Sequence, residues 1–236
     1  MTSPGRLIAS GRDSDIFAYA PGLVLRRSRQ GRSMEAEARV MEFVRQHQYP
    51  VPAIEELSQD GTELVMEHIE GPSMVAAMER RPWSVRRQAR VLADLHRQLH
   101  DLPAPDFLPA APAGAGDRML HLDLHPLNVM IGPRGPVVID WPNACAGDPA
   151  VDVALTWALS ATGEVPTSRI RGSLVALLRT SFVNAFLGAC DRRSAEGQLK
   201  DVIEWKMTDP NMSESENRGM RALLVAVETG ASATGS

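Results

Sequence analysis

The sequence lacks the features typical of disulfide-rich, membrane-spanning or nucleic-acid-binding proteins. Its two cysteines, Cys145 and Cys190, do not make a disulfide framework. It has no apolar signal core at the N-terminus, and its longest apolar stretch, near residues 150–161, is interrupted by Asp152 and too short to cross a bilayer. The net charge of −4 is the opposite of the basic excess that nucleic-acid binding needs. We therefore expect a soluble cytoplasmic protein without a membrane or nucleic-acid partner.

The chain has enough residues and enough hydrophobic side chains to fold around a large core. It contains 236 residues, of which 44% are hydrophobic, an ordinary share for a globular protein. This length corresponds to one large domain or two small ones.

A short hairpin is predicted near the middle of the chain. Two apolar runs, residues 129–131 and 137–139, are joined by the Gly-Pro-Arg-Gly segment 132–135, and glycine and proline supply the turn dihedrals. Asn128 precedes the first run and Asp140 follows the second. An amide and a carboxylate would therefore meet at the open end of one hairpin.

The residues around this hairpin suit phosphoryl transfer. That reaction needs a base to accept a hydroxyl proton and oxygen ligands to hold Mg²⁺ on the phosphates. Asp123, five residues before Asn128, fits the base. Asn128 and Asp140 fit the metal ligands, because Mg²⁺ prefers hard oxygen donors and takes few of them from protein.

Two other interpretations of this stretch remain open. If residues 121–125 formed a strand, His121, Asp123 and His125 would share one face and could bind zinc in a hydrolase. That interpretation gives Asn128 and Asp140 no role, and Pro126 would break the strand. The other alternative is a buried strand with a few polar ends, which does not explain so many titratable groups beside an apolar hairpin.

The compound motif resembles the catalytic core of the aminoglycoside phosphotransferase and choline kinase group, which are relatives of the protein kinases. Members of that group carry a His-x-Asp-x-x-x-x-Asn pattern, a hairpin, and then Ile-Asp-Trp or Ile-Asp-Phe. The present chain has His121, Asp123 and Asn128 in this spacing, followed by the Ile-Asp-Trp segment 139–141. The resemblance spans nearly the whole chain, and its most specific part is the segment from residue 121 to residue 140.

The resemblance implies a two-lobe, protein kinase-like α+β fold. A small antiparallel-sheet lobe for nucleotide binding would cover residues 1–69, and a larger, mostly helical lobe for catalysis and acceptor binding would cover residues 70–236. ATP would sit between the lobes, with Mg²⁺ on Asn128 and Asp140. His121 would brace the catalytic loop, and Asp123 would orient and deprotonate a substrate hydroxyl.

The same resemblance implies nucleotide contacts in the N-terminal part of the chain. Ser14 belongs to a predicted turn at the place of the loop over the nucleotide phosphates, although the turn has one glycine instead of a glycine-rich pattern. Glu67 and Ile69 match positions whose backbone hydrogen-bonds adenine. Only main-chain groups act there, so the two side chains need not be distinctive.

Arg26 is the clearest departure from the family pattern, which has a lysine at this position. Arginine also stays charged and binds phosphate, but its larger planar fork is not equivalent to lysine. We expect Arg26, at the end of a predicted strand, to pair with Glu37 on the predicted helix 33–48, with Glu35 as the competing partner. Arg27 should point to the other side of the strand. Stability would depend little on the pair if solvent reaches it.

Two further groups of polar residues are predicted from local patterns. His96 and His100 are four residues apart on a predicted helix and could ligate a metal, but no His-Glu-x-x-His pattern accompanies them, so no metal is expected. Asp148 and Asp152 precede or begin an apolar helix, and we expect them to act as a cap and a hydrogen-bond anchor.

The predicted function is that of an ATP-dependent O-phosphotransferase acting on a small molecule. The alternatives are a nucleotide-binding regulatory member with weak or no catalysis, which Arg26 favours, and the metal-dependent hydrolase. Phosphate machinery is shared among kinases of aminoglycosides, macrolides, choline, homoserine and sugar-like amines, so the sequence does not choose the acceptor. It also leaves open whether ATP or GTP is preferred and what the oligomeric state is.

Overall fold

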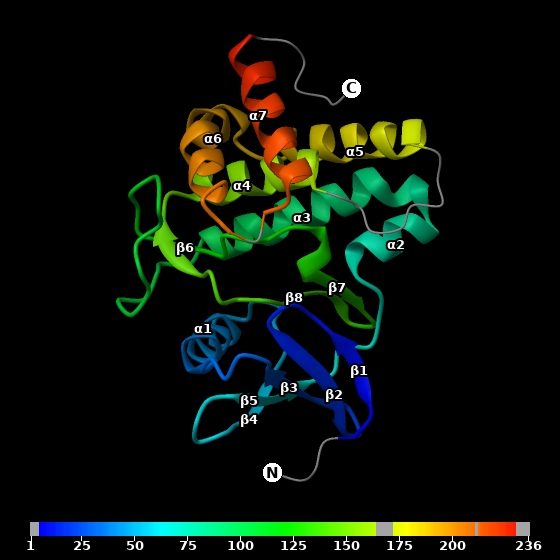
Figure 1. Ribbon diagram of the computed structural model, residues 1–236, viewed down its shortest axis with the longest axis vertical. Coiled ribbons are helices and arrows are strands. Elements are labelled where there is room, and N and C mark those ends of the chain that lie inside the picture. The colour runs from blue at the N-terminus through cyan, green and yellow to red at the C-terminus, as the bar shows by residue number, and fades with distance from the viewer. Residues whose placement is uncertain (1–4, 164–171, 211, 230–236) are drawn as a thin grey trace. The chain divides into compact units, whose positions relative to one another are not determined.

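The computed structural model describes residues 5–163, 172–210 and 212–229 (Figure 1). The chain divides into two compact units, Met1–Ser73 with Asn128–Ala144, and Met74–Leu127 with Cys145–Ser236. Residues 128–144, which contain the predicted hairpin, thus belong with the N-terminal residues. The division of the chain into functional lobes at residue 69 stays a prediction.

The first unit is built on a five-stranded antiparallel sheet with the strand order β1-β2-β3-β5-β4. Its strands are β1 Leu7–Ser10, β2 Ser14–Ala20, β3 Leu23–Ser28, β4 Ile54–Leu57 and β5 Glu63–Glu67. The central pair, β3 and β5, supplies the buried residues Val24, Leu25, Leu64 and Val65. These short apolar runs form strands because packing on a half-buried pleated surface suits branched side chains.

The tight turn between β4 and β5 depends on glycine. Gly61 has a φ of +71°, and a Cβ atom there would lie 2.2 Å from the side-chain oxygen of Ser33. Its carbonyl accepts a hydrogen bond from the backbone N–H of Met34, just before the helix that follows β3 in sequence. The turn therefore fixes the start of that helix as well as the register of the two strands.

Helix α1, Glu35–Gln46, belongs to the same unit and packs near β4. Ala38, Val40, Met41 and Val44 are buried along one side of it, as the roughly 3.6-residue spacing predicts. The helix ends before Tyr49 and the proline that follows it, because the residue before proline avoids the helical region. The buried ring of Tyr49 then meets Trp141 edge to face, with ring centroids 5.6 Å apart.

The predicted hairpin is present as β7, Val129–Gly132, and β8, Gly135–Val138. Two backbone hydrogen bonds attach it to the rest of the first unit: Ile131 donates to Pro72, and Val138 donates to Pro50, each over 2.8 Å. Ile139 also donates to the carbonyl of Asn128 over 3.0 Å. The open end of the hairpin therefore has a defined position in this unit.

The second unit is mostly helical and surrounds the apolar helix α4 (Figure 1). Its helices are α2 Met74–Arg80, the 3₁₀ turn η1 Pro82–Ser84, α3 Val85–His100, α4 Pro149–Thr162, α5 Gly172–Leu187, α6 Arg192–Lys206 and α7 Glu214–Glu228. A further 3₁₀ turn, η2, covers Pro126–Asn128 at the junction of the two units. Every residue from Ala150 to Ala158 is buried, because α3, α5, α6 and α7 all contact α4.

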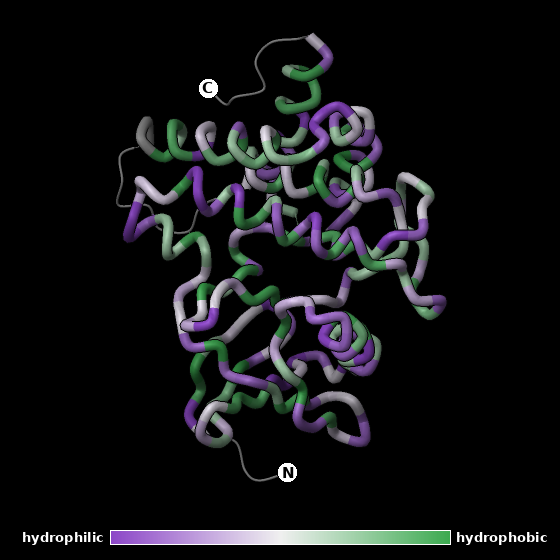
Figure 2. Tube along the Cα trace, turned by 180° about the vertical axis from the view of Figure 1, so that it is seen from behind, coloured by the Kyte–Doolittle hydropathy of each residue, from purple (hydrophilic) through white to green (hydrophobic). Residues whose placement is uncertain are grey.

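The spacing of three leucines in the sequence predicts an amphipathic helix here, and α3 has this pattern. Leu92, Leu95 and Leu99 are buried on one face, while hydrophilic and hydrophobic residues alternate along the helix (Figure 2). A short ladder of β6, Arg118–Leu120, and β9, Cys145–Gly147, was not predicted, because three residues are too few to show strand periodicity. The sequence also predicts a helix that begins near residues 166–168, and this segment lies outside the described residues. Among the described helices, none combines the length and apolar character needed to cross a bilayer.

Candidate active site

The loop that carries Asp123 is held by a buried carboxylate. Asp152, in the first turn of α4, accepts hydrogen bonds from the backbone N–H groups of His121 and Leu122, each over 3.0 Å. His100 Nε2 lies 3.1 Å from the same carboxylate. The predicted anchor role of Asp152 is confirmed, and so is the cap role of Asp148, which accepts from the N–H of Ala150.

Leu122 is held in a conformation that leucine rarely adopts. Its φ is +54°, and its side chain is buried. An L-residue with a Cβ atom in this region is strained by about 1 kcal/mol or more. The hydrogen bond from its N–H to Asp152 offsets this strain and fixes the backbone immediately before Asp123.

Asp123 has the protonation state that a general base requires. Burial raises its pKa, but the hydrogen bond and charge of His125, together with His121 and Lys206, outweigh burial and leave the pKa below its ordinary value. His125 Nε2 lies 3.4 Å from the Asp123 carboxylate, whose side chain is 20% exposed. The carboxylate is therefore ionised at neutral pH and is partly accessible.

Arg26 is the centre of a polar network in the first unit. Its guanidinium lies 2.6 Å from Glu37, donates to the Ser14 hydroxyl over 2.8 Å, and lies 3.6 Å from Asp140. The predicted pairing of Arg26 with Glu37 is confirmed. Two predicted nucleotide residues, Ser14 and Glu37, and one predicted metal ligand, Asp140, thus meet around the guanidinium of a third nucleotide residue, whose several N–H groups can bind separate acceptors.

Arg27 has different partners, as the alternation of side chains along a strand requires. Its guanidinium binds Glu63 over 2.6 Å and lies over the Phe17 ring, 5.3 Å from the ring centroid. It is also more exposed than Arg26. The expected register of β3 is therefore correct.

Glu37 also fixes the backbone beside Asp140. Its carboxylate accepts from the N–H of Trp141 over 3.2 Å, and its side chain is only 4% exposed. The expectation that stability depends little on this pair required solvent contact, which Glu37 does not have. Loss of Arg26 would leave a buried carboxylate without its cation, so we expect a substantial loss of stability.

Asn128 and Asp140 lie at the open end of the β7–β8 hairpin, as predicted. Asn128 is buried, and Asp140, with a φ of +69°, has a side chain that is 44% exposed. An amide oxygen and a carboxylate are hard donors, and few protein ligands are typical of Mg²⁺, which keeps several waters. The donor set therefore fits Mg²⁺, although Arg26 beside Asp140 already supplies one positive charge.

Glu67, the first predicted adenine position, ends β5, and Ile69, the second, lies two residues beyond it. The Glu67 carboxylate forms an ion pair with Arg134 in the hairpin turn, and the Glu67 N–H donates to Ala53 over 2.8 Å. In the described part of the chain, no backbone carbonyl accepts from the Ile69 N–H. The main chain of Ile69 can thus offer a donor to a ligand.

The zinc alternative built on His121, Asp123 and His125 has lost its premise. Residues 121–125 form a loop and not a strand, and His121 is fully buried. The group of side chains with metal-ligand geometry in the described ranges is a different one: His96, His100 and Asp152.

Sequence reasoning missed two partners of the predicted site residues. From the sequence, His125 is interpreted only as a zinc ligand, whereas the structure places it beside the Asp123 carboxylate. The two residues are two positions apart in the sequence, and this spacing could have indicated the contact. Arg134 was treated only as part of a turn, whereas it binds Glu67, 67 residues earlier in the chain. Nothing in the sequence signals that contact.

Comparison with known proteins gives a family and a fold. The model of the phosphotransferase enzyme family matches residues 5–119 and 105–186, which is more than half of the chain. No curated protein matches the chain.

Several solved structures are similar over nearly the whole chain. A choline/ethanolamine kinase family protein from Mesorhizobium loti is 16% identical with a TM-score of 0.61, over 99% of this chain and 91% of that one. The ternary complex of APH(2")-IIa with streptomycin and ATP is 15% identical with a TM-score of 0.62, over 93% and 90%. A Plasmodium vivax ethanolamine kinase is 12% identical with a TM-score of 0.58, over 94% and 80%. The kinase-like α+β fold is thereby confirmed.

Replacement of the loop anchor should destabilise the protein in a pH-dependent way. Asp152→Asn removes the negative charge of a carboxylate that accepts three hydrogen bonds. The free energy of unfolding at pH 7 should therefore fall by about 3 kcal/mol or more. Burial raises the pKa of Asp152, but His100, His96 and the His121 N–H outweigh it and leave the pKa below the ordinary 3.8. This stabilisation is therefore complete above about pH 4 and is lost as the pH falls further.

Urea unfolding of the wild type and Asp152→Asn at pH 7 and pH 3 measures this difference. The difference in the free energy of unfolding between the two proteins should be smaller at pH 3 than at pH 7. Asp117→Asn, at a side chain that is 90% exposed, should match the wild type at both pH values. A gap of equal size at both pH values would show that the charge of Asp152 is not what stabilises the loop.

Proposed function

Because the chain belongs to the phosphotransferase enzyme family, we propose that it is a small-molecule kinase that transfers the γ-phosphoryl group of ATP to a hydroxyl group. The observation that carries the proposal is the network around Arg26, in which Glu37, Ser14 and Asp140 share one guanidinium. In this network the buried carboxylate of Glu37 orients the Arg26 cation beside the partly exposed carboxylate of Asp140. The cation is suited to hold nucleotide phosphates, and the exposed carboxylate is suited to hold their metal ion.

The first unit would bind the nucleotide and the metal. Arg26 would contact phosphate oxygens with N–H groups additional to the one that binds Glu37, and Ser14 would lie in the loop over the phosphates. Asn128 and Asp140 would hold Mg²⁺, which neutralises phosphate charge when it is bound. The main chain at Glu67 and Ile69 would hydrogen-bond the adenine.

The second unit would supply the proton acceptor. Asp123, ionised and partly exposed, would orient the acceptor hydroxyl and take its proton as the oxygen attacks phosphorus. His121 would brace the loop from its buried position. Asp152 and the strained Leu122 would keep the Asp123 backbone in place, which matters because catalysis of phosphoryl transfer depends mainly on positioning.

We propose a hydroxylated amine as the acceptor. The solved structures of similar fold include proteins named for choline, ethanolamine or aminoglycosides, or bound to streptomycin, kanamycin or gentamicin. All of these compounds combine hydroxyl groups with nitrogen that is positively charged at neutral pH. A panel of aminoglycosides, macrolides, choline, ethanolamine, homoserine and amino sugars, assayed for nucleotide consumption, would identify the acceptor.

GTP is a second candidate for the phosphoryl donor. Two of the similar structures are GDP complexes, whereas another contains ATP. The same panel should therefore be run with both nucleotides. Because ATP and Mg²⁺ are cytoplasmic reagents, we propose that the protein acts in the cytoplasm.

A regulatory protein that binds nucleotide without turnover is the competing function, and Arg26 in place of lysine is the observation that favours it. The pairing with Glu37 supports activity, because arginine keeps the carboxylate contact expected of the lysine. Nucleotide binding without consumption for any acceptor in the panel would support the regulatory function instead.

Asp123→Asn separates binding from catalysis. The variant should bind Mg²⁺–ATP normally, while kcat with an identified acceptor should fall by about 10²–10⁴-fold, because the amide cannot accept the proton. Asp117→Asn makes the same chemical change at an exposed position and should leave kcat unchanged. Full activity of Asp123→Asn would rule out Asp123 as the base.

Asp140→Ala tests the proposed metal ligand. It should weaken Mg²⁺-dependent ATP binding by more than about tenfold. Loss of a residue that only hydrogen-bonds a metal ligand already lowers metal affinity by about that factor. Adenosine affinity should barely change, because the adenine contacts are made elsewhere. Asp140→Asn should be included, since asparagine tolerates the positive φ of this position and alanine does not. Equal losses for ATP and adenosine would mean that Asp140 is structural.

Three arginine variants test the phosphate contact. Arg26→Ala should lower ATP affinity about tenfold or more, because hydrogen bonds to charged groups contribute about 1.5–3 kcal/mol. Arg27→Ala, whose side chain binds Glu63, should bind ATP normally. Arg26→Lys restores a cation and should bind ATP better than Arg26→Ala.

The arginine measurements should be made on folded protein, because Arg26→Ala also removes the partner of buried Glu37. If Arg27→Ala loses affinity and Arg26→Ala does not, the assignment is off by one residue. If neither loses affinity, the cation is not part of the site and the regulatory function gains support.

A further inference from the structure

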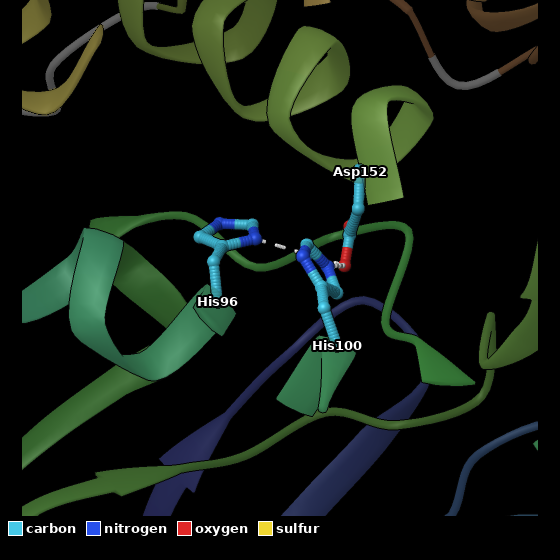
Figure 3. Close-up of side chains that lie close together, drawn as sticks. All are labelled: His96, His100 and Asp152. Atoms are coloured by element: carbon cyan, nitrogen blue, oxygen red, sulfur yellow. Dashed lines mark hydrogen bonds and ion pairs between the residues drawn. The ribbon is translucent and has the colours of Figure 1, made fainter. Parts of the chain in front are cut away.

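A cluster of three side chains joins α3 to α4 within the second unit. Figure 3 shows His96 and His100 on successive turns of α3 pointing toward Asp152 at the start of α4. One potential ligand atom from each residue lies within 4.8 Å of the other two. His96 and Asp152 are buried, and the His100 side chain is 10% exposed. None of the three is a proposed nucleotide, Mg²⁺ or proton-transfer residue.

The hydrogen bonds of His96 determine which of its ring nitrogens carries the hydrogen. Nε2 lies 3.2 Å from the carbonyl of Leu124 and 3.1 Å from the Thr156 hydroxyl. The Thr156 hydroxyl donates its own hydrogen to the Leu124 carbonyl over 2.7 Å. Both neighbours of Nε2 therefore act as acceptors, so Nε2 must be the donor. In a neutral ring, Nδ1 then has a lone pair and no hydrogen.

The lone pair on Nδ1 of His96 faces a negative charge. Nδ1 lies 3.7 Å from an Asp152 carboxylate oxygen, and no described residue makes a hydrogen bond to this buried nitrogen. The separation of 3.7 Å is longer than a hydrogen bond, so no hydrogen bond joins the two atoms. Two buried acceptors that face each other without a hydrogen between them favour a bound cation.

The spacing of the three groups suits a transition-metal ion. Zinc bonds of about 2.0–2.2 Å at tetrahedral angles place ligand atoms about 3.4 Å apart. His100 Nε2 is 3.1 Å and His96 Nδ1 is 3.7 Å from the same Asp152 oxygen, each within a few tenths of an ångström of this spacing. A bound metal would also bring together the two ring nitrogens, which lie within 4.8 Å of each other. The metal would replace the His100 hydrogen in its bond to Asp152. The bonds from the His121 and Leu122 N–H groups to Asp152 would remain.

A cavity of about 540 Å³ adjoins the cluster and provides access to it. His96 and His100 line this cavity, together with residues that include Cys190 and Ser194. An ion could enter from this side, and a water molecule could complete its coordination there. Two imidazole nitrogens and one carboxylate, with a position left for water, form a ligand set that zinc commonly takes.

We propose that His96, His100 and Asp152 form a binding site for one divalent transition-metal ion of the zinc class, with water from the adjoining cavity as the remaining ligand. The proposal does not rest on the proposed kinase function, although one of its ligands, Asp152, also anchors the loop before Asp123. It also differs from the proposed Mg²⁺ ligands, which supply only oxygen. Nitrogen ligands favour zinc, cobalt or nickel over Mg²⁺, so Mg²⁺ should not compete for this site.

Zinc binding to the full-length, chelator-treated protein tests the proposal without an assay of activity. A titration against a chromophoric zinc chelator should show one equivalent bound per chain. Zinc at about 100 times its dissociation constant should raise Tm by about 5 °C or more, whereas Mg²⁺ should not. Co²⁺ should give the intense visible absorption of a four-coordinate ion with nitrogen and oxygen ligands.

Variants locate the bound ion. His100→Asn removes a ligand at a slightly exposed position, and His96→Gln removes Nδ1 while its amide can still donate to Leu124. Each should weaken zinc binding at least about tenfold and abolish the Tm shift. His47→Asn, at an exposed histidine in the first unit, should bind like the wild type, and so should Cys190→Ser, which removes the cavity thiol.

Three results would overturn the proposal. A protein with no stoichiometric zinc binding would mean that the two acceptors are bridged by water. Zinc binding that survives in both His100→Asn and His96→Gln would place the ion elsewhere. Loss of zinc binding in Cys190→Ser alone would assign it to the thiol. Because no measurement here uses ATP or an acceptor, failure of the kinase function would leave each of these results interpretable.

Discussion

A buried carboxylate that accepts a backbone N–H is the interaction on which the candidate residues of each unit depend. In the second unit Asp152 binds the N–H of Leu122, and in the first unit Glu37 binds the N–H of Trp141. Each bond lies at or next to a residue with positive φ, Leu122 at +54° and Asp140 at +69°. Neither conformation is stable for an isolated chain. The two carboxylates therefore hold the strained backbone that orients the functional side chains.

The two carboxylates are compensated in different ways, with different consequences. Glu37 has a full positive charge beside it, the Arg26 guanidinium, which also contacts Ser14 and Asp140. A lysine has three donors on one nitrogen and could not reach acceptors in such different directions. The arginine at this position is therefore compatible with an intact site. The charge of Asp152, in contrast, is compensated mainly by N–H donors. One of its oxygens therefore still faces the lone pair on His96 Nδ1.

Local patterns predicted the elements well, because strand, helix and hairpin signals depend on neighbours in sequence. The hairpin, the buried face of α3 and the pairing of Arg26 with Glu37 follow from spacing and from the family resemblance. The contacts that were missed join distant parts of the chain. Arg134 meets Glu67, and Asp152 meets a histidine 52 residues earlier. Periodicity contains no information on such pairs, since tertiary packing brings them together.

Residues 128–144 belong to the first unit although they follow part of the second unit in sequence. This arrangement explains how the proposed nucleotide binding can be separated from the proposed proton transfer. Asn128 and Asp140 are held by backbone bonds to Pro50 and Pro72 through the hairpin, and by Glu37 through Trp141. The proposed metal ligands and the proposed phosphate-binding cation, Arg26, therefore share one compact unit, and Asp140 also contacts Arg26 directly. Asp123 depends on a different carboxylate in a different unit. The contacts of Arg26 with Ser14, Glu37 and Asp140 do not involve Asp123, so loss of the proposed base need not weaken nucleotide binding. A change at Arg26 disturbs Glu37 and Asp140 together, so cation, metal and backbone effects there are coupled and must be resolved by paired variants.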